Sequence, residues 1–314
     1  MSTQGHKPKR PVISWLRTRL KRSRLYARWL LNEVPKNPRY ELYARRQGTL
    51  DRRAFIADRA GGAEAVRRSL APFHKADIPK IIWIYWQQGE AEAPFVVRRC
   101  IARWRQMNPG WEVRVLDAQN VSEHLDMSDY HDGLPPRFFA NLLRMRLMRT
   151  HGGVWTDATV YCHRPLDDWL APLLVTGFFV FRTPGAGRWF ASWFLVSERD
   201  HLLPTLWEQG YAPFVKSLTY VPDLYFSLSY MFQWQIKRHP QALALWRQSP
   251  AMPSTPTFFM MEALRGTLPV ARLHEMLESG TPVSKLTWKE IVDEAAFEAL
   301  CAEIDAEPAA SGSA

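Results

Sequence analysis

A carboxylate with a hydroxyl on either side follows an apolar segment near the middle of the chain. In the segment GGVWTDAT, residues 152–159, Asp157 lies between Thr156 and Thr159. Carboxylate and hydroxyl oxygens are the hard ligands that Mg²⁺ or Mn²⁺ prefers. Such a cation neutralises a diphosphate and helps a nucleotide to depart as a leaving group. A single acid at a strand end is also common as a cap or turn residue, so other features must decide between the two interpretations.

The elements that must position Asp157 begin with a strand–helix–strand unit. Residues 80–86 form an apolar strand, and a polar turn leads to a helix over 94–107. Turn chemistry at Asn108-Pro109-Gly110 precedes a second strand over 111–117. Short connections in this order predict a parallel sheet with helices on its faces.

A second helix and strand lead directly to the acid. The helix is expected over 138–150 and ends at His151-Gly152-Gly153, after which a strand starts at Val154. A further strand is expected over 178–182. Later helices are expected at residues 203–217, 222–238 and 270–278.

Two of these strands end in side chains that suit a nucleotide. Ligands of open α/β sheets gather beyond the carboxyl ends of parallel strands, where Trp86 and Asp157 should lie. An aromatic face stacked on a base contributes about 1–3 kcal/mol. Trp86 is equally well interpreted as a core residue, and Trp83, which points to the other side of the strand, is expected in the core.

Five stretches follow one another along residues 76–290: IPKIIWIYWQQG (78–89), NPGW (108–111), NLLR (141–144) with GGVWTDAT (152–159), DLYF (223–226) and VSKLTWK (283–289). Taken together and in this order, they resemble the capsular polysaccharide synthesis glycosyltransferases, a group related to Golgi mannosyltransferases and to the glucosylating domains of clostridial toxins. The resemblance implies a GT-A fold: a Rossmann-like, mostly parallel sheet flanked by helices that binds a nucleotide-sugar, with UDP-sugar expected, and a divalent cation, Mn²⁺ or Mg²⁺. It also implies retention of the anomeric configuration.

The resemblance assigns roles to individual residues. Trp86 matches an aromatic residue that meets the base, while Asn141 and Arg144 match a pair that meets the donor sugar. Asn141 is a departure, because the broader group usually has Asp there. Asp157 matches the first acid of an Asp-x-Asp signature, and Thr159 replaces the second, so both are the expected metal ligands.

Two later residues complete the expected site. Asp223 resembles an acid on the acceptor side and, with Asp157, is a candidate catalytic residue; it could instead cap a helix after Pro222. Lys285 could reach the leaving phosphates as a point charge, or it could be a solvated lysine.

Charge is concentrated at the start of the chain. Residues 1–75 hold 19 Lys or Arg and 5 Asp or Glu, whereas the rest holds 22 and 26. An arginine-rich amphipathic helix over 12–34 suits an anionic membrane surface. Packing on the body is an equal alternative; a transit peptide or nucleic-acid arm is weaker. We expect no nucleic-acid partner, because the body is mildly acidic.

Composition sets the expected organisation. The chain divides into a basic helical extension (1–75), a GT-A domain (76–290) and a C-terminal helix end with a flexible tail (291–314). No apolar run reaches the roughly 18 residues that span a bilayer, and the three cysteines form no close pair, which indicates a reducing compartment. We expect a cytoplasmic enzyme, peripheral on the inner membrane face, that acts on a glycan or lipid-linked acceptor. A catalytically degenerate scaffold or regulator is the alternative.

Overall fold

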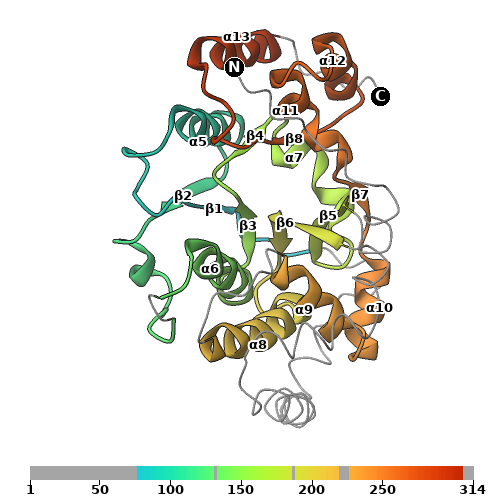
Figure 1. Cartoon of the computed structure of the whole chain (residues 1–314). Helices are drawn as coiled ribbons and strands as arrows, with labels where there is room; N and C mark the ends of the chain where they lie inside the picture. The colour runs from blue at the N-terminus through green and yellow to red at the C-terminus, as the bar shows by residue number, and fades with distance from the viewer. Residues whose placement is uncertain (1–75, 131–132, 186–187, 219–225, 307–314) are drawn as a thin grey trace, which may run out of the picture.

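A computed structural model describes residues 76–130, 133–185, 188–218 and 226–306. In this part of the chain, a six-stranded sheet lies between two layers of helices (Figure 1). The strand order is β2-β1-β3-β6-β5-β7, and three of the five neighbouring pairs are parallel. The predicted α/β class with a mostly parallel sheet is confirmed.

The predicted strand–helix–strand unit opens the described chain. β1 (Ile81–Tyr85) leads into α5 (Phe95–Met107), which returns to β2 (Glu112–Leu116). β2 pairs with β1 in parallel, as short crossover connections require. Ile82, Trp83 and Ile84 are fully buried in succession, because helices cover both faces of the sheet.

The rest of the sheet reverses direction at β6. α6 (Pro136–Thr150) ends at His151 and is followed by β3 (Gly153–Thr156), which pairs with β1 in parallel. β6 (Arg188–Ser197) then lies antiparallel to both β3 and β5 (Phe178–Gly185). The sequence analysis had no strand at β6, although it forms the centre of the sheet. β7 (Met252–Pro253) adds a short parallel edge.

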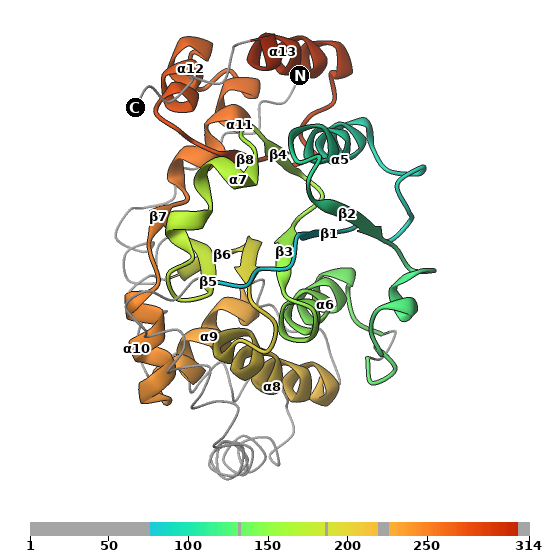
Figure 2. The same ribbon diagram turned by 180° about the vertical axis from the view of Figure 1, so that it is seen from behind.

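Alternating side chains of the sheet enter two separate cores. On one face, Trp83 and Trp155 pack with α6, α8 (Leu202–Ser217) and α9 (Ser227–Ile236). On the other face, Ile82 and Val154 pack with α5 and α7 (Leu166–Trp169). Figure 2 shows both helix layers from behind. The expected core position of Trp83 is confirmed.

A second, two-stranded sheet lies next to α5. β4 (Val160–Cys162) pairs antiparallel with β8 (Val283–Lys285), and so brings the C-terminal part of the chain back to the segment that follows Asp157. The remaining helices are η1 (Val121–Glu123), η2 (Ala171–Leu173), α10 (Pro240–Gln248), η3 (Thr255–Phe258), α11 (Phe259–Leu264), α12 (Val270–Glu278) and α13 (Glu294–Ala306).

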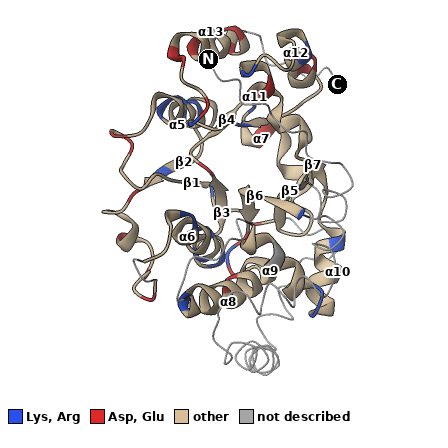
Figure 3. Ribbon diagram, viewed as in Figure 1, with Lys and Arg blue, Asp and Glu red and all other residues tan. Residues whose placement is uncertain are grey.

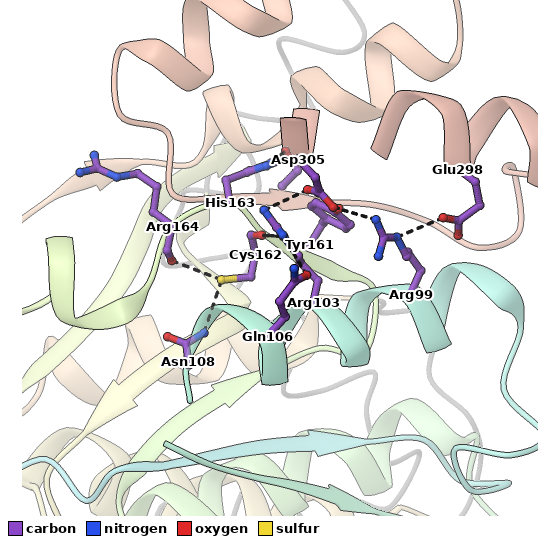
Figure 4. Close-up of polar contacts among 11 residues, drawn as sticks. Arg99, Arg103, Gln106, Asn108, Tyr161, Cys162, His163, Arg164, Glu298 and Asp305 are labelled. Carbon is purple, nitrogen blue, oxygen red and sulfur yellow. Dashed lines mark hydrogen bonds and ion pairs between the residues drawn. The ribbon is translucent and has the colours of Figure 1, made fainter. Parts of the chain in front are cut away.

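Opposite charges join α13 to α5. All charged residues of α13 are acidic and all those of α5 are arginines. Figure 3 shows red segments on α13 and blue segments on α5. Asp305 accepts hydrogen bonds from the hydroxyl of Tyr161 at 2.8 Å, and its oxygens lie 2.7 Å from Arg99 and 2.9 Å from Arg103 (Figure 4). Glu298 pairs with Arg99 at 3.1 Å. This cluster attaches the last helix to the body of the fold.

The helix predicted over 270–278 is confirmed, and that over 203–217 is confirmed to within one residue. The helix predicted over 222–238 begins only at Ser227 among the described residues, after a turn at Phe226. Residues 291–314 contain a full helix, α13, rather than only a helix end. The extension predicted over residues 1–75, including the helix at 12–34, lies outside the described residues.

Candidate active site

Two glycines allow β3 to approach β1 closely and so place Asp157. Gly152 and Gly153 have φ angles of +67° and +90°. A Cβ atom on Gly153 would lie 2.6 Å from the carbonyl oxygen of Ile81, closer than any side chain can stand. Glycine is therefore required at this turn for both conformation and space. Asp157 follows β3 directly, and its backbone N–H donates to the carbonyl of Trp193 on β6.

A cavity of about 190 Å³ opens where the polypeptide leaves β1 and β3. Four residues singled out from the sequence line it together: Trp86, Arg144, Asp157 and Thr159. They come from the end of β1, the middle of α6 and the segment after β3. The other lining residues are Tyr85, Ala140, Trp155, Ala158 and Trp288.

Asp157 stands between two cations. Its Oδ1 accepts a hydrogen bond from the indole of Trp155 at 3.1 Å and lies 3.3 Å from Nη1 of Arg144. Its Oδ2 lies 3.6 Å from Nζ of Lys285. The side chain of Asp157 is 27% exposed, and those of Arg144 and Lys285 are 8% and 19% exposed. The acid therefore faces the cavity, with Arg144 beside it in the cavity wall and Lys285 behind it.

These neighbours determine the charge of the acid. Burial raises the pKa of Asp157, but the charges of Arg144 and Lys285 outweigh burial and bring the pKa below its ordinary value. The carboxylate is therefore ionised at neutral pH. Burial lowers the pKa of Lys285, and Asp157 opposes that shift. With one anion and two cations, the group has a net charge of +1.

Arg144 is fixed on α6 by more than the ion pair. Its Nε donates to the carbonyl of Ala140 at 3.2 Å, and its Nη1 donates to the carbonyl of Ser192. The guanidinium carbon lies 5.0 Å from the ring centre of Trp155, which adds a cation–π contact. A rigid, largely desolvated guanidinium beside a cavity is well suited to bind an anion.

Lys285 reaches the site from β8. Its Nζ donates a hydrogen bond to Oγ1 of Thr159 at 2.5 Å in addition to facing Asp157. The alternative of a solvated lysine does not describe this side chain, which is mostly buried. Lys285 lies behind Asp157 and Thr159, the two lining residues that it contacts.

The carboxylate and the hydroxyl that were predicted to bind a metal do not form a set suited to one. Within the described ranges, no three His, Cys, Asp or Glu side chains lie close enough to hold an ion together. Asp157 is the single carboxylate among the residues that line the cavity. Both of its oxygens and the hydroxyl of Thr159 already face a cation, so Mn²⁺ or Mg²⁺ has a poor fit here, and we assign no metal-dependent step.

The side chain of Asn141 is directed away from the cavity. Asn141 lies on α6, one turn before Arg144, but its amide donates to the hydroxyl of Tyr211 on α8 at 3.1 Å. It is not among the residues that line the cavity. Burial raises the pKa of Tyr211 to about 12, although the hydrogen bond with Asn141 opposes the shift. Asp223 lies outside the described residues.

Trp288 is a site residue that the sequence analysis did not assign. It is 38% exposed, and its ring centre lies 5.8 Å from that of Trp86 at an angle of 86°. Both tryptophans line the cavity, and Trp86 also packs against the core on one face of the sheet. The segment VSKLTWK contained Trp288, but nothing in its spacing indicated that the residues after β8 return to the end of β1.

Comparisons with known proteins give matches to one protein family and to two curated glycosyltransferases. A sequence profile of one protein family, described as capsular polysaccharide synthesis protein, matches residues 54–304. The chain is 28% identical over 150 residues to O-glycosyltransferase braB of Annulohypoxylon truncatum, which covers 39% of this chain and 34% of that protein. It is 28% identical over 101 residues to glycosyltransferase afumC of Aspergillus fumigatus, covering 27% and 26%. The match therefore spans about a third or less of these curated relatives.

One solved structure has a weak overall similarity. It is described as PaToxG Glycosyltransferase, shares 11% sequence identity and superposes with a TM-score of 0.38 over 73% of this chain and 85% of that chain.

None of the helices in the described part of the protein has the length and apolar character needed to cross a bilayer.

Proposed function

The chain belongs to the capsular polysaccharide synthesis protein family, and from this premise we propose that it is a glycosyltransferase whose active site is the cavity between Trp86 and Arg144. The donor is a nucleotide-sugar, with UDP-sugar the expected class, and the acceptor is a glycan or a lipid-linked glycan. One observation carries the proposal: Trp86, Arg144, Asp157 and Thr159, which come from three separate elements of the fold, line a single cavity at the carboxyl ends of parallel strands.

Each wall of the cavity suits one part of such a donor. Trp86 and Trp288 offer aromatic faces to a base. Arg144, supported by Lys285 behind Asp157, offers positive charge to a diphosphate. Asp157 then lies where the sugar joins the diphosphate, and it keeps both cations in position. Preorganised charge of this kind stabilises a departing anion without rearrangement.

We propose that transfer proceeds with retention, with the departing phosphate as the base for the acceptor hydroxyl. Apart from Asp157, no residue that lines the cavity in the described part of the chain has a carboxylate. Asp157 itself is engaged by two cations. A double displacement would need a free nucleophile. Asp223 stays a proposed acceptor-side residue on the basis of the sequence.

The test is donor hydrolysis and transfer across a panel of nucleotide-sugars, with an Asp157→Asn variant. The variant keeps the shape of the side chain but loses the charge that holds Arg144 and Lys285. Small misplacements of groups at an active site cost about 10²-fold in rate, so we expect turnover to fall at least that far while circular dichroism stays unchanged. Equal turnover of Asp157→Asn and wild type would remove this cavity as the active site.

The Asn141–Tyr211 hydrogen bond supports a second candidate function. Asn141 is uncharged and directed at α8 rather than at the cavity, which suits a member of the family that binds a nucleotide but transfers nothing and acts as a scaffold in polysaccharide assembly. UDP binding without turnover of any nucleotide-sugar in the panel would favour this second function.

The basic segment before residue 76 is the proposed contact with an anionic membrane surface, on the inner face of the cytoplasmic membrane. Its support is the excess of 19 basic over 5 acidic residues in positions 1–75. Flotation with vesicles that contain anionic lipid should recover the full chain. A variant that lacks residues 1–34 should not float with the vesicles, yet it should keep donor hydrolysis. Equal flotation of both proteins would contradict the proposal.

A further inference from the structure

We propose that the ammonium group of Lys285 is a built-in replacement for the divalent cation at this site, so that nucleotide binding needs no metal. The inference rests on the proposed function, because it concerns how the same cavity holds a nucleotide diphosphate. Its basis is the position of one nitrogen atom relative to the two side chains expected to chelate an ion.

The Nζ of Lys285 occupies the place between the expected ligands. It donates to Oγ1 of Thr159 at 2.5 Å and lies 3.6 Å from Oδ2 of Asp157. A cation chelated by the positions of an Asp-x-Asp signature would have to contact these same two oxygens. β8 brings the lysine there through its antiparallel pairing with β4, in which Val160 lies opposite Lys285.

The residue at the second position of the signature, Thr159, supports the replacement of a divalent ion by an ammonium group. Thr159 is neutral, so the pair of positions has one negative charge rather than two, and one ammonium group balances it. A divalent ion would instead be held by one carboxylate and a hydroxyl, which is a weak set. The hydroxyl oxygen of Thr159 is already an acceptor for Lys285.

The charges around Asp157 oppose the entry of a divalent ion. Arg144 on one side and Lys285 on the other give the group a net charge of +1 before any ligand arrives. Their side chains are 8% and 19% exposed, and charges that are poorly screened by water repel an added cation more strongly. The same surplus attracts a diphosphate.

Lys285 also acts on the ligand through Asp157. An ammonium group has three N–H donors, of which one serves Thr159 and one points toward Asp157. Because Lys285 neutralises Asp157 from behind, the charge of Arg144 at the cavity wall is left for the phosphate oxygens. Arg144 and Lys285 together would thus provide what a metal ion provides to a diphosphate.

Calorimetric titration of the full-length protein with UDP, in excess EDTA and in excess Mn²⁺, measures the metal requirement directly. We expect the two dissociation constants to agree within about twofold, less than 0.5 kcal/mol. Uridine, titrated in the same buffers, measures the part of the binding free energy that does not depend on the phosphates. Mn²⁺ bound to the protein, followed by its electron paramagnetic resonance signal, should be undetectable for the wild type with or without UDP.

Two variants should make UDP binding dependent on Mn²⁺. Lys285→Met removes the ammonium and keeps the length of the side chain, and Thr159→Asp restores a second carboxylate. In EDTA, both should weaken UDP binding by about tenfold or more, 1.4 kcal/mol by the usual conversion. Mn²⁺ should restore binding to both and become detectable on the protein. Lys80→Met, which removes an exposed lysine paired with Asp167 far from the cavity, is the matched control and should behave as wild type.

The outcomes separate this inference from the proposed function. UDP binding by the wild type that disappears in EDTA and returns with Mn²⁺ would overturn the inference while supporting the nucleotide site. Metal-free binding that Lys285→Met and Thr159→Asp both leave unchanged would also overturn it. No UDP binding in either buffer would overturn both. Should Lys285→Met fail to fold, as thermal unfolding would show, Thr159→Asp provides the same test at the surface of the cavity.

Discussion

Lys285 and Asp157 face each other across a distance of 3.6 Å although they belong to different sheets. Asp157 follows β3 of the six-stranded sheet, and Lys285 ends β8 of the two-stranded sheet. The pairing of β8 with β4, which directly follows the segment after Asp157, brings them together. The site therefore depends on the C-terminal part of the chain folding back onto the half that contains Asp157.

Replacement of Trp288 should weaken nucleotide binding. Trp288 is 38% exposed at the cavity and meets Trp86 edge to face. Stacking on a base contributes about 1–3 kcal/mol, so Trp288→Ala should raise the dissociation constant of UDP by about tenfold, measured by calorimetry. Trp288→Phe should recover much of the loss because it keeps an aromatic face. Equal affinities for all three proteins would remove Trp288 from the site.

The UDP affinity should fall at alkaline pH because of Lys285. Burial lowers the pKa of this lysine from its ordinary value of 10.5. The ammonium therefore loses its proton as pH rises through a value below 10.5, with loss of attraction for the diphosphate. Lys285→Arg should shift this decline upward, because a guanidinium stays charged. Titration of the ligand itself is common to both proteins, so superimposable pH profiles would contradict the assignment.

Gly153 should be irreplaceable at the turn before Asp157. Its φ is +90°, and a Cβ atom would lie 2.6 Å from the carbonyl oxygen of Ile81. Gly153→Ala should lower the free energy of unfolding by at least about 2 kcal/mol, measured by urea denaturation. Gly110→Ala is the control, because nothing lies within 4 Å of the added atom and the φ of Gly110 is not positive. Similar losses of unfolding free energy in both variants would show that the turn before β3 tolerates a side chain at position 153.

Removal of Asp305 should destabilise the fold without affecting the cavity. Asp305 is the partner of Tyr161, Arg99 and the buried Arg103. Its loss leaves a buried guanidinium without its carboxylate, which costs about 3–5 kcal/mol. Asp305→Ala should show this loss in urea denaturation and keep the UDP affinity of the wild type at temperatures where it is folded.

Glu298→Ala is the control for this cluster. Glu298 pairs with the same Arg99, but its side chain is 44% exposed, and an exposed pair contributes about 1 kcal/mol or less. Comparable losses for Asp305→Ala and Glu298→Ala would mean that burial does not set the contribution of this cluster.

The sequence alone determined the elements whose signals are local. Apolar runs closed by turn residues located β1, α5 and β2, and their short connections required parallel pairing. The Gly152-Gly153 pair indicated a sharp turn before Asp157, and the helical spacing of Arg144 placed it one turn after Asn141. The family was recognisable from the order of these segments, as the match over residues 54–304 shows.

Only the tertiary structure decided which residues from distant segments are in contact. β6 is buried on both faces, so its run of aromatic and apolar residues has no alternation to mark it as a strand. No local pattern could place Lys285 on Asp157 and Thr159, or Trp288 beside Trp86, because strand pairing between β4 and β8 sets those distances. The sequence therefore identified a candidate metal ligand, and only the fold showed that a lysine already faces it.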